Sequence, residues 1–193
     1  MSARIRRPLA VVGDVAAVAG IGLSWFLLSE LNSWLFAGLE HTSRAHWIFL
    51  PAAFRPLIIL LFGRTGMLGL VLGSYLTISG TTDAFAAVTL SLNLGTLPWG
   101  AVSLGKVLLD IPQSLAGLRA RHIMLLCFLC AGTNAIALNG YLWLLGQLDG
   151  GAIQVATVFV GDMAGSTIVL LLISILLAQI RPSWLAAYEG ASR

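Results

Sequence analysis

Two charged residues lie inside segments that are otherwise apolar, and this placement makes them the first candidates for function. Arg55 lies in WIFLPAAFRPLIILLF, between Pro51 and Pro56, and Asp162 lies in VFVGDMAGSTIVLLL. A charge near the middle of a membrane is costly unless it faces the protein interior and has a partner. We therefore expect Arg55 and Asp162 to pair inside a bundle. Such a pair can be a structural clasp, or it can belong to a ligand, ion or proton site.

The composition indicates an integral membrane protein. Of the 193 residues, 58% are hydrophobic and 10% are charged, and the mean hydropathy is +0.92, more than a soluble domain of this length can bury in one core. The apolar segments suit helices that cross a hydrocarbon core of roughly 30 Å, and no alternating polar pattern indicates a barrel. The predicted fold class is an all-α polytopic transmembrane helical bundle, a single integral membrane domain over residues 1–193. Its six predicted spans are Pro8–Ser29, Trp47–Gly63, Thr65–Ser79, Ala84–Leu109, His122–Gln147 and Ala152–Ile180.

The charged residues of the connections predict the orientation, because cytoplasmic loops carry an excess of Lys and Arg. With six spans, one side receives Arg4, Arg6, Arg7, Arg64, Lys106, Arg119, Arg121, Arg181 and Arg193. The opposite side receives Glu30, Glu40, Asp83 and Asp149, with Arg44 as its basic residue. Both termini are therefore expected in the cytoplasm. Aromatic residues, Trp25 among them, fall near the predicted outer interface, where amphipathic rings prefer to lie.

Four polar residues are predicted to share one layer of the bundle. Arg55, Asn93 and Asp162 lie eight, nine and ten residues from the outer ends of their spans, about 12–15 Å deep at 1.5 Å per residue. Asn134 lies slightly deeper on the fifth span. Residues before a proline are biased away from helical geometry, Pro98 interrupts the fourth span, and broken helices are tolerated where they line a cavity. We therefore expect a ligand-binding or buried polar layer of Arg55, Asn93, Asn134 and Asp162 between spans two, four and six.

Two further patterns concern packing. Residues 30–46 carry Leu31, Trp34, Leu35 and Leu39 at helical spacing, which predicts an outer-face amphipathic helical connection, either an interfacial anchor or a lid. Two pairs of glycines at GxxxG spacing indicate close helix packing within the chain: Gly69 with Gly73 in span three, and Gly161 with Gly165 in span six.

Several functions find no support in the sequence. It contains no Walker loop, HExxH, GxSxG or dinucleotide fingerprint, so we do not expect an enzyme or a cofactor. Basic residues are scattered rather than gathered in a stripe, which argues against a nucleic-acid partner. Cys127 and Cys130 lie in an apolar run without further ligands, and the three histidines are too scattered for a metal set. The cysteines are predicted to be packing residues.

The order of these features resembles a known family. The stretch LPAAFRPLIILLFGRTGMLGLVLGSYL, the fourth span LSLNLGTLPWGAV and the late span VFVGDMAGSTIVLLL together resemble the first-described class of MASE-type membrane-associated sensor domains of bacteria. The similarity covers residues 47–180. Its most specific residues are Pro51, Gly63, Gly73, Asn93, Gly161, Asp162 and Gly165. The chain departs from the family pattern at Arg55, where an apolar or small residue is expected, in its number of spans, and in having no output domain after Arg181.

The resemblance implies a sensory module in the cytoplasmic (inner) membrane of a bacterium, active in signal transduction. Besides the lipid bilayer, we expect a membrane or cytoplasmic protein partner, because the sequence shows no output domain of its own, and a small-molecule ligand for the polar layer. Two alternatives remain open. One is a substrate-binding or membrane subunit of a transporter, similar to the six-helix subunits of energy-coupling-factor importers. The other is a structural subunit of a membrane complex, in which Arg55 and Asp162 form only a clasp.

Overall fold

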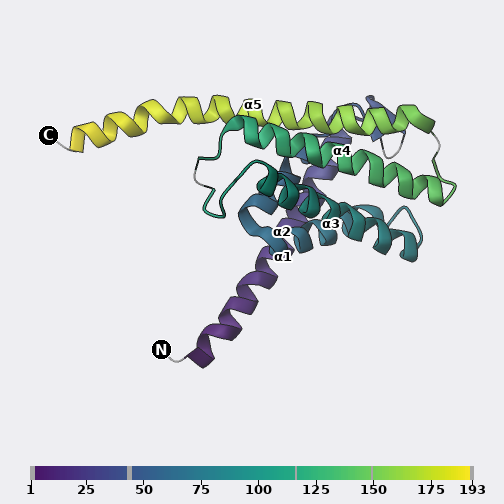
Figure 1. The fold of residues 1–193 in the computed structure, drawn as a ribbon, viewed down its shortest axis with the longest axis horizontal. Helices are drawn as coiled ribbons and strands as arrows, with labels where there is room; N and C mark the ends of the chain where they lie inside the picture. The colour runs from purple at the N-terminus through teal and green to yellow at the C-terminus, as the bar shows by residue number, and fades with distance from the viewer. Residues whose placement is uncertain (1–2, 43–44, 116, 149, 192–193) are drawn as a thin grey trace.

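The structure is a computed structural model that describes residues 3–42, 45–115, 117–148 and 150–191, with side chains between residues 11 and 179. The described chain is mostly helical, and the remainder is one short strand pair and the connections between the helices (Figure 1). Its long helices are α1 (Ala3–Leu35), α2 (Phe54–Ile78), α3 (Ala84–Leu108), α4 (Ala120–Leu144) and α5 (Gly151–Ala191). The connection between α1 and α2 contains the antiparallel strands β1 (Glu40–Thr42) and β2 (Ala45–His46) and the 3-10 helix η1 (Leu50–Ala53).

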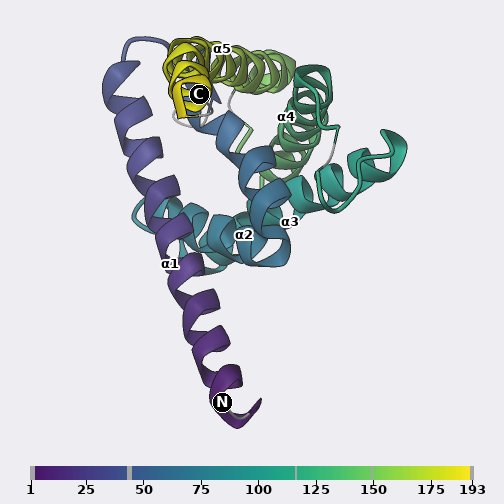
Figure 2. The same cartoon turned by 90° about the vertical axis from the view of Figure 1, so that its left-hand side faces the viewer.

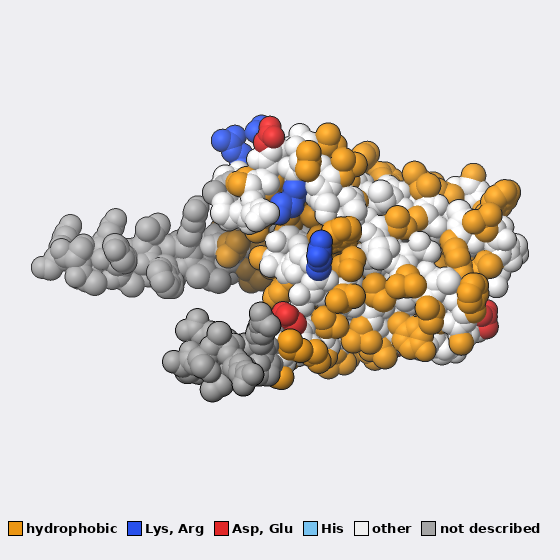
Figure 3. All heavy atoms as spheres, turned by 60° about the horizontal axis from the view of Figure 1, so that its bottom comes forward, with side chains coloured by type: hydrophobic (Ala, Val, Ile, Leu, Met, Phe, Trp, Pro, Cys, Tyr) orange, Lys and Arg blue, Asp and Glu red, His pale blue; other side chains and the backbone are white. Residues whose placement is uncertain are grey.

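Among the described residues, five helical segments are long and apolar enough to cross a membrane. Many large hydrophobic side chains on them point outward, such as Val12, Leu61 and Ile136, which are 65%, 67% and 72% exposed. Hydrophobic side chains spread across the middle of the face shown in Figure 3. An apolar exterior on apolar helices is the pattern of a protein surrounded by lipid. The expectation of an all-α multi-pass membrane protein is confirmed.

The second and third predicted spans are joined in α2, and the count of six spans is not confirmed. Gly63 interrupts α2 with φ 54° and ψ −121°, a conformation that glycine adopts far more readily than other residues. The chain reverses there, because a Cβ placed on Gly66 would lie 2.7 Å from the carbonyl oxygen of Ile58. In a continuous helix, residues this far apart in sequence would be separated by about 12 Å. The two arms of α2, residues 54–62 and 64–78, therefore form a hairpin.

This hairpin lies at the centre of the bundle. The second arm runs parallel to α1, because Gly69 contacts Ile21 and Gly73 contacts Trp25. Figure 2 shows α2 in the middle, with α1 on one side and α4 on the other. The N-terminal end of α1 and the C-terminal end of α5 both lie on the left in Figure 1, on the side of the α3–α4 connection. The α4–α5 turn lies on the right.

Pro56 and Pro98 end up where a helix tolerates them, which corrects the expectation of broken geometry at Arg55 and Pro98, whereas the chain before Pro51 is not α-helical. Pro51 is near the start of η1, and Pro56 lies in the first turn of α2, where its missing N–H has no helical partner to lose. Arg55 is therefore helical, and Leu50 begins η1. Pro98 lies inside α3, which continues through it to Leu108. The interruption is at the glycine, Gly63, instead.

The predicted amphipathic helix over residues 30–46 is only partly present. Helix α1 continues to Leu35, and a turn and the β1–β2 pair follow. In the helical part, Leu31 and Trp34 are 47% and 76% exposed and Glu30 and Ser33 are exposed too, whereas Asn32 is 1% exposed. Asn32 Oδ1 accepts a hydrogen bond from the Leu50 N–H, and Asn32 Nδ2 donates to the Ile48 carbonyl. Asn32 is turned inward because it binds the backbone of the returning chain.

Candidate functional site

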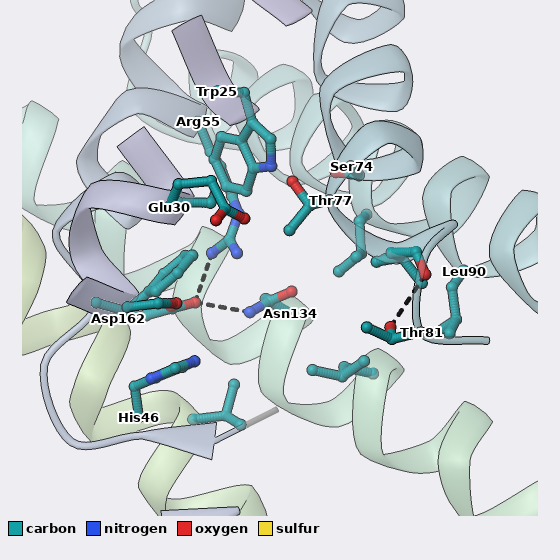
Figure 4. A pocket seen from close by; sticks show the side chains of 17 residues that line it. Trp25, Glu30, His46, Arg55, Ser74, Thr77, Thr81, Leu90, Asn134 and Asp162 are labelled. Carbon is teal, nitrogen blue, oxygen red and sulfur yellow. Dashed lines mark hydrogen bonds and ion pairs between the residues drawn. The ribbon is translucent and has the colours of Figure 1, made fainter. Parts of the chain in front are cut away.

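Arg55 and Asp162 form the expected ion pair in the interior. Arg55 Nη1 donates to Asp162 Oδ2 at 2.6 Å, and the two side chains are 5% and 3% exposed. Asn134 Nδ2 donates to the same oxygen at 2.7 Å. We refer to these three residues, from α2, α5 and α4, as the Arg55 cluster (Figure 4). Two charge-assisted hydrogen bonds to one carboxylate oxygen compensate for much of the hydration that Asp162 loses on burial.

Aromatic rings enclose the guanidinium. Arg55 Cζ lies 5.0 Å from the ring centroid of Trp25 and 5.3 Å from that of Phe49. The two rings meet edge to face, with centroids 6.0 Å apart. A cation over an aromatic face is attracted by the ring's quadrupole, most strongly where water is excluded. The rings therefore stabilise the charge of Arg55 and also restrict the directions in which it can turn.

A cavity of about 290 Å³ adjoins the cluster. Its polar inner wall is formed by the Arg55 cluster with Ser29 and Ser74, and apolar side chains such as Leu90 and Val158 complete it. Exposed residues, Glu30, Ser33 and Thr81, line the other end. They belong to the C-terminal part of α1 and to the connection after α2, so the cavity opens at the end of the bundle where these segments lie.

Several buried polar atoms on the cavity wall have no hydrogen-bond partner among the described residues. Besides His46 Nδ1, which lies 3.4 Å from Glu40 Oε1, they are Arg55 Nε, Asn134 Oδ1, Ser29 Oγ and Ser74 Oγ. All four side chains are 5% exposed or less. An unsatisfied buried polar group costs about 1–3 kcal/mol, so native proteins rarely leave several in one place without water or a ligand. These atoms belong to residues that line the cavity, so an occupant that reaches them would satisfy them.

The segment 46–50, which is extended up to Phe49, holds one side of the cavity in place. Gly161 and Gly165 lie against its backbone: a Cβ on Gly161 would collide with the carbonyl oxygen of His46, and one on Gly165 with that of Phe49. The Phe49 N–H donates to the Gly161 carbonyl at 3.0 Å. Non-helical backbone within a membrane domain needs such partners because lipid offers none. The second GxxxG pair thus packs against extended chain, whereas Gly69 and Gly73 pack against helix α1.

The structure does not bring Asn93 into the cluster. Asn93 is half-buried, and its Nδ2 donates to the Thr89 carbonyl of its own helix. Its neighbour Leu94 and, one turn earlier, Leu90 face the cavity instead. The prediction of a polar layer between spans two, four and six therefore needs correction: the fifth span supplies the amide, through Asn134. Depth along a helix was matched correctly, but the rotation of α3 about its axis turned Asn93 away.

Sequence reasoning missed Trp25, Ser29, Ser74 and His46 as wall residues. Trp25 is expected at the outer membrane interface, yet it is 4% exposed because it packs against Gly73 and the guanidinium. Ser29 and Ser74 lie at helical positions where a serine usually bonds its own backbone, so their types alone carry no signal. The useful signal was the glycine of span three, since a close approach of α1 at Gly73 brings Trp25 toward Arg55.

His46 contributes to the wall without adding a charge at neutral pH. Its Nδ1 lies 3.4 Å from Glu40 Oε1, and its ring stacks on Phe49 with centroids 5.8 Å apart. Burial lowers the pKa of His46, against the opposing effects of Glu40 and Asp162, which raise it. A pKa below the ordinary value of about 6.5 leaves the imidazole neutral at pH 7. The cavity's charge at that pH is therefore set by its Arg and carboxylate side chains.

The two cysteines are buried free thiols of α4. Cys130 Sγ lies 4.0 Å from the Pro98 carbonyl oxygen, in a core cluster with Leu126 and Val102. Within the part of the chain that the structure describes, no three His, Cys, Asp or Glu side chains gather as a metal site would require. Of the orientation markers, Arg44, Asp149, Arg193 and the side chains of Arg4, Arg6, Arg7 and Arg181 lie outside the described residues.

Comparison of the chain with known protein families, with curated proteins and with solved structures gives no match.

Proposed function

We propose that this protein is a membrane-embedded ligand-binding module of a sensory type, which holds a small molecule beside the Arg55 cluster and acts through a separate protein partner. The observation that carries the proposal is a set of buried polar atoms, on Arg55, Asn134, Ser29 and Ser74 of one cavity wall, that have no hydrogen-bond partner among the described residues. A structural clasp needs only the ion pair, and it would be more stable with the remaining wall apolar. Polar residues that line one cavity from α1, both arms of α2 and α4 are better suited to a ligand.

We also propose that both termini are cytoplasmic in a bacterial inner membrane. The parallel packing of α1 and the second arm of α2 supports this, because the chain must go back into the membrane between them. The two arms of the α2 hairpin count as one pass inward and one pass outward. Together with α1, α3, α4 and α5 they make an even number of passes. Lys106 in the last turn of α3 and Arg119 at the start of α4 supply basic residues on the same side as both termini.

The α2 hairpin need not reach the cytoplasmic surface for this orientation to hold. Gly95 of α3 packs against Met67 and Val71, and the two helices are antiparallel. Gly63 therefore lies about 10 Å short of the end of α3 at 1.5 Å per residue. Reporter fusions after Arg121 and after Arg193 should both report the cytoplasm. A periplasmic signal from either fusion would overturn the orientation.

The last helix is the proposed route from the site to the partner. Asp162 lies on α5, and residues 171–179 of the same helix are exposed on all sides although most of them are apolar. In Figure 1 this part of α5 extends away from the other helices toward the C-terminus. A ligand that shifts Asp162 would therefore also move the exposed part of α5. A transporter subunit would use the same exposed surface for its coupling partner, so the identity of the co-purifying protein separates the two functions.

The ligand can be sought by mass spectrometry of small molecules that co-purify from membranes in mild detergent. We expect the wild-type protein to retain a small molecule and Ser74→Leu to lose it. Ser74 lines the cavity and is only 1% exposed, so a leucine in its place would fill the cavity. Thr96→Leu is the matched control, since Thr96 is exposed and bonds only its own helix in the described contacts. It should retain the molecule. Equal retention by all three proteins, or none by any of them, would refute the proposed site, provided that their gel-filtration profiles agree.

A further inference from the structure

We infer that the occupant of this cavity is an uncharged polar organic molecule that offers both a hydrogen-bond donor and a hydrogen-bond acceptor to the Arg55 cluster. The inference rests on the proposed ligand-binding function and names the chemical class of its ligand. Three features of the wall support it: the charge balance, the types of the unpartnered atoms and the apolar remainder of the surface.

The charge balance excludes a net charge at the inner end of the cavity. Arg55 and Asp162 neutralise each other at 2.6 Å, with both side chains almost fully buried. An anionic ligand would compete with Asp162 for the guanidinium, and a cationic ligand would compete with Arg55 for the carboxylate. Either one would leave a buried charge without compensation, which is strongly unfavourable. The remaining carboxylate on the wall, Glu30, is exposed at the open end, where water screens it.

The unpartnered atoms require complementary groups on the ligand. Arg55 Nε can only donate, and Asn134 Oδ1 can only accept. Asn134 has no freedom to exchange these roles by turning its amide, because its Nδ2 is held by Asp162 Oδ2 at 2.7 Å. Ser29 and Ser74 can each donate or accept. A ligand that satisfies this wall must therefore carry at least one acceptor for Arg55 and one donor for Asn134 (Figure 4).

The rest of the wall favours a compact molecule with an apolar body. Trp25, Phe49, Leu90, Leu138 and Val158 line the same cavity. At about 290 Å³ the cavity is at the small end of the range for ligand sites in proteins. Amides and lactams on a single ring combine an adjacent acceptor and donor with an apolar face. They are the simplest members of the class.

Three probes of nearly equal shape test the inference: benzamide, which is neutral, benzoate, which is an anion, and benzamidinium, which is a cation. Binding to the intact protein in nanodiscs can be measured by ligand-observed NMR at pH 7. We expect wild type to bind benzamide at least about tenfold more tightly than either ion, because a tenfold preference needs only about 1.4 kcal/mol. Ser74→Leu should abolish this binding, which separates occupancy of the cavity from partitioning into lipid.

The preference should change when the ion pair is altered. Asp162→Asn leaves the guanidinium unbalanced and should shift the preference toward benzoate, and Arg55→Gln leaves the carboxylate and should shift it toward benzamidinium. Asn134→Leu removes the acceptor, so it should weaken benzamide about tenfold. If these variants do not fold, the wild-type ranking alone decides.

Each result has a defined meaning. An ion that binds wild type most tightly, with binding lost in Ser74→Leu, would overturn the ligand class and leave the ligand-binding function standing. If no probe binds, or if Ser74→Leu binds all three as wild type does, the cavity holds only water. That result would overturn both the inference and the proposed function.

Discussion

Replacing either Arg55 or Asp162 with leucine should destabilise the protein by about 3–5 kcal/mol, and replacing both should cost clearly less than the sum. Each single change strands the remaining charge in a part of the structure where both side chains are 5% exposed or less. Asp162→Leu also removes the acceptor of Asn134 Nδ2 and leaves that donor unpaired. The double change removes both charges at once. The resulting interaction energy between Arg55 and Asp162 would be among the largest expected for a single pair in the chain.

The measurement is a double-mutant cycle on stability in detergent, by chemical or thermal unfolding. Asn93→Leu combined with Asp162→Leu is the matched control, because Asn93 is also polar and at a similar depth but bonds only Thr89 of its own helix in the described contacts. That pair should be additive within about 0.5 kcal/mol. Additive behaviour of Arg55 and Asp162 themselves would show that they do not interact in the folded protein. If the two changes are coupled, and the double variant folds but no longer retains its small molecule, the pair serves a ligand as well as the fold.

Gly161→Ala and Gly165→Ala should each cost about 3 kcal/mol or more, which is large for the addition of one methyl group. The new Cβ would collide with a backbone carbonyl oxygen, that of His46 or that of Phe49. A backbone atom cannot move aside as the end of a flexible side chain can, so the strain has to displace segment 46–50. The displacement would also break the hydrogen bond from the Phe49 N–H to the Gly161 carbonyl. Phe49 would then no longer cover the Arg55 guanidinium.

Two glycines of α4 provide the matched controls. Nothing lies within 4 Å of a Cβ placed on Gly132 or Gly140, so alanine there should be neutral or should stabilise the helix by roughly 0.5–1 kcal/mol. Unfolding temperatures of the four variants would rank the sites directly. If Gly161→Ala and Gly165→Ala were as stable as the α4 variants, segment 46–50 would not pack against α5 in the way the structure has it.

Sequence alone was sufficient to predict the class of the protein and the pairing of its two buried charges. Apolar helices could be recognised because a membrane-spanning helix must be long and hydrophobic, and both properties can be read from one continuous stretch of sequence. The boundaries of α3 and α4 fall within a few residues of their predicted spans for that reason. Arg55 and Asp162 could be matched because an unpaired charge in this setting is so unfavourable that two opposite charges at one depth have few alternatives.

Tertiary structure decided which other residues join that pair. The rotation of each helix about its axis depends on all of its neighbours at once, and a rotation of one residue position is enough to replace Asn93 with Leu94 at the cavity. The reversal at Gly63, the inward turn of Asn32 and the extended segment 46–50 likewise arise from contacts between residues distant in sequence. Local pattern showed which side chains must avoid lipid, and the packing of α1, α4, α5 and the α2 hairpin determined which of them share one cavity.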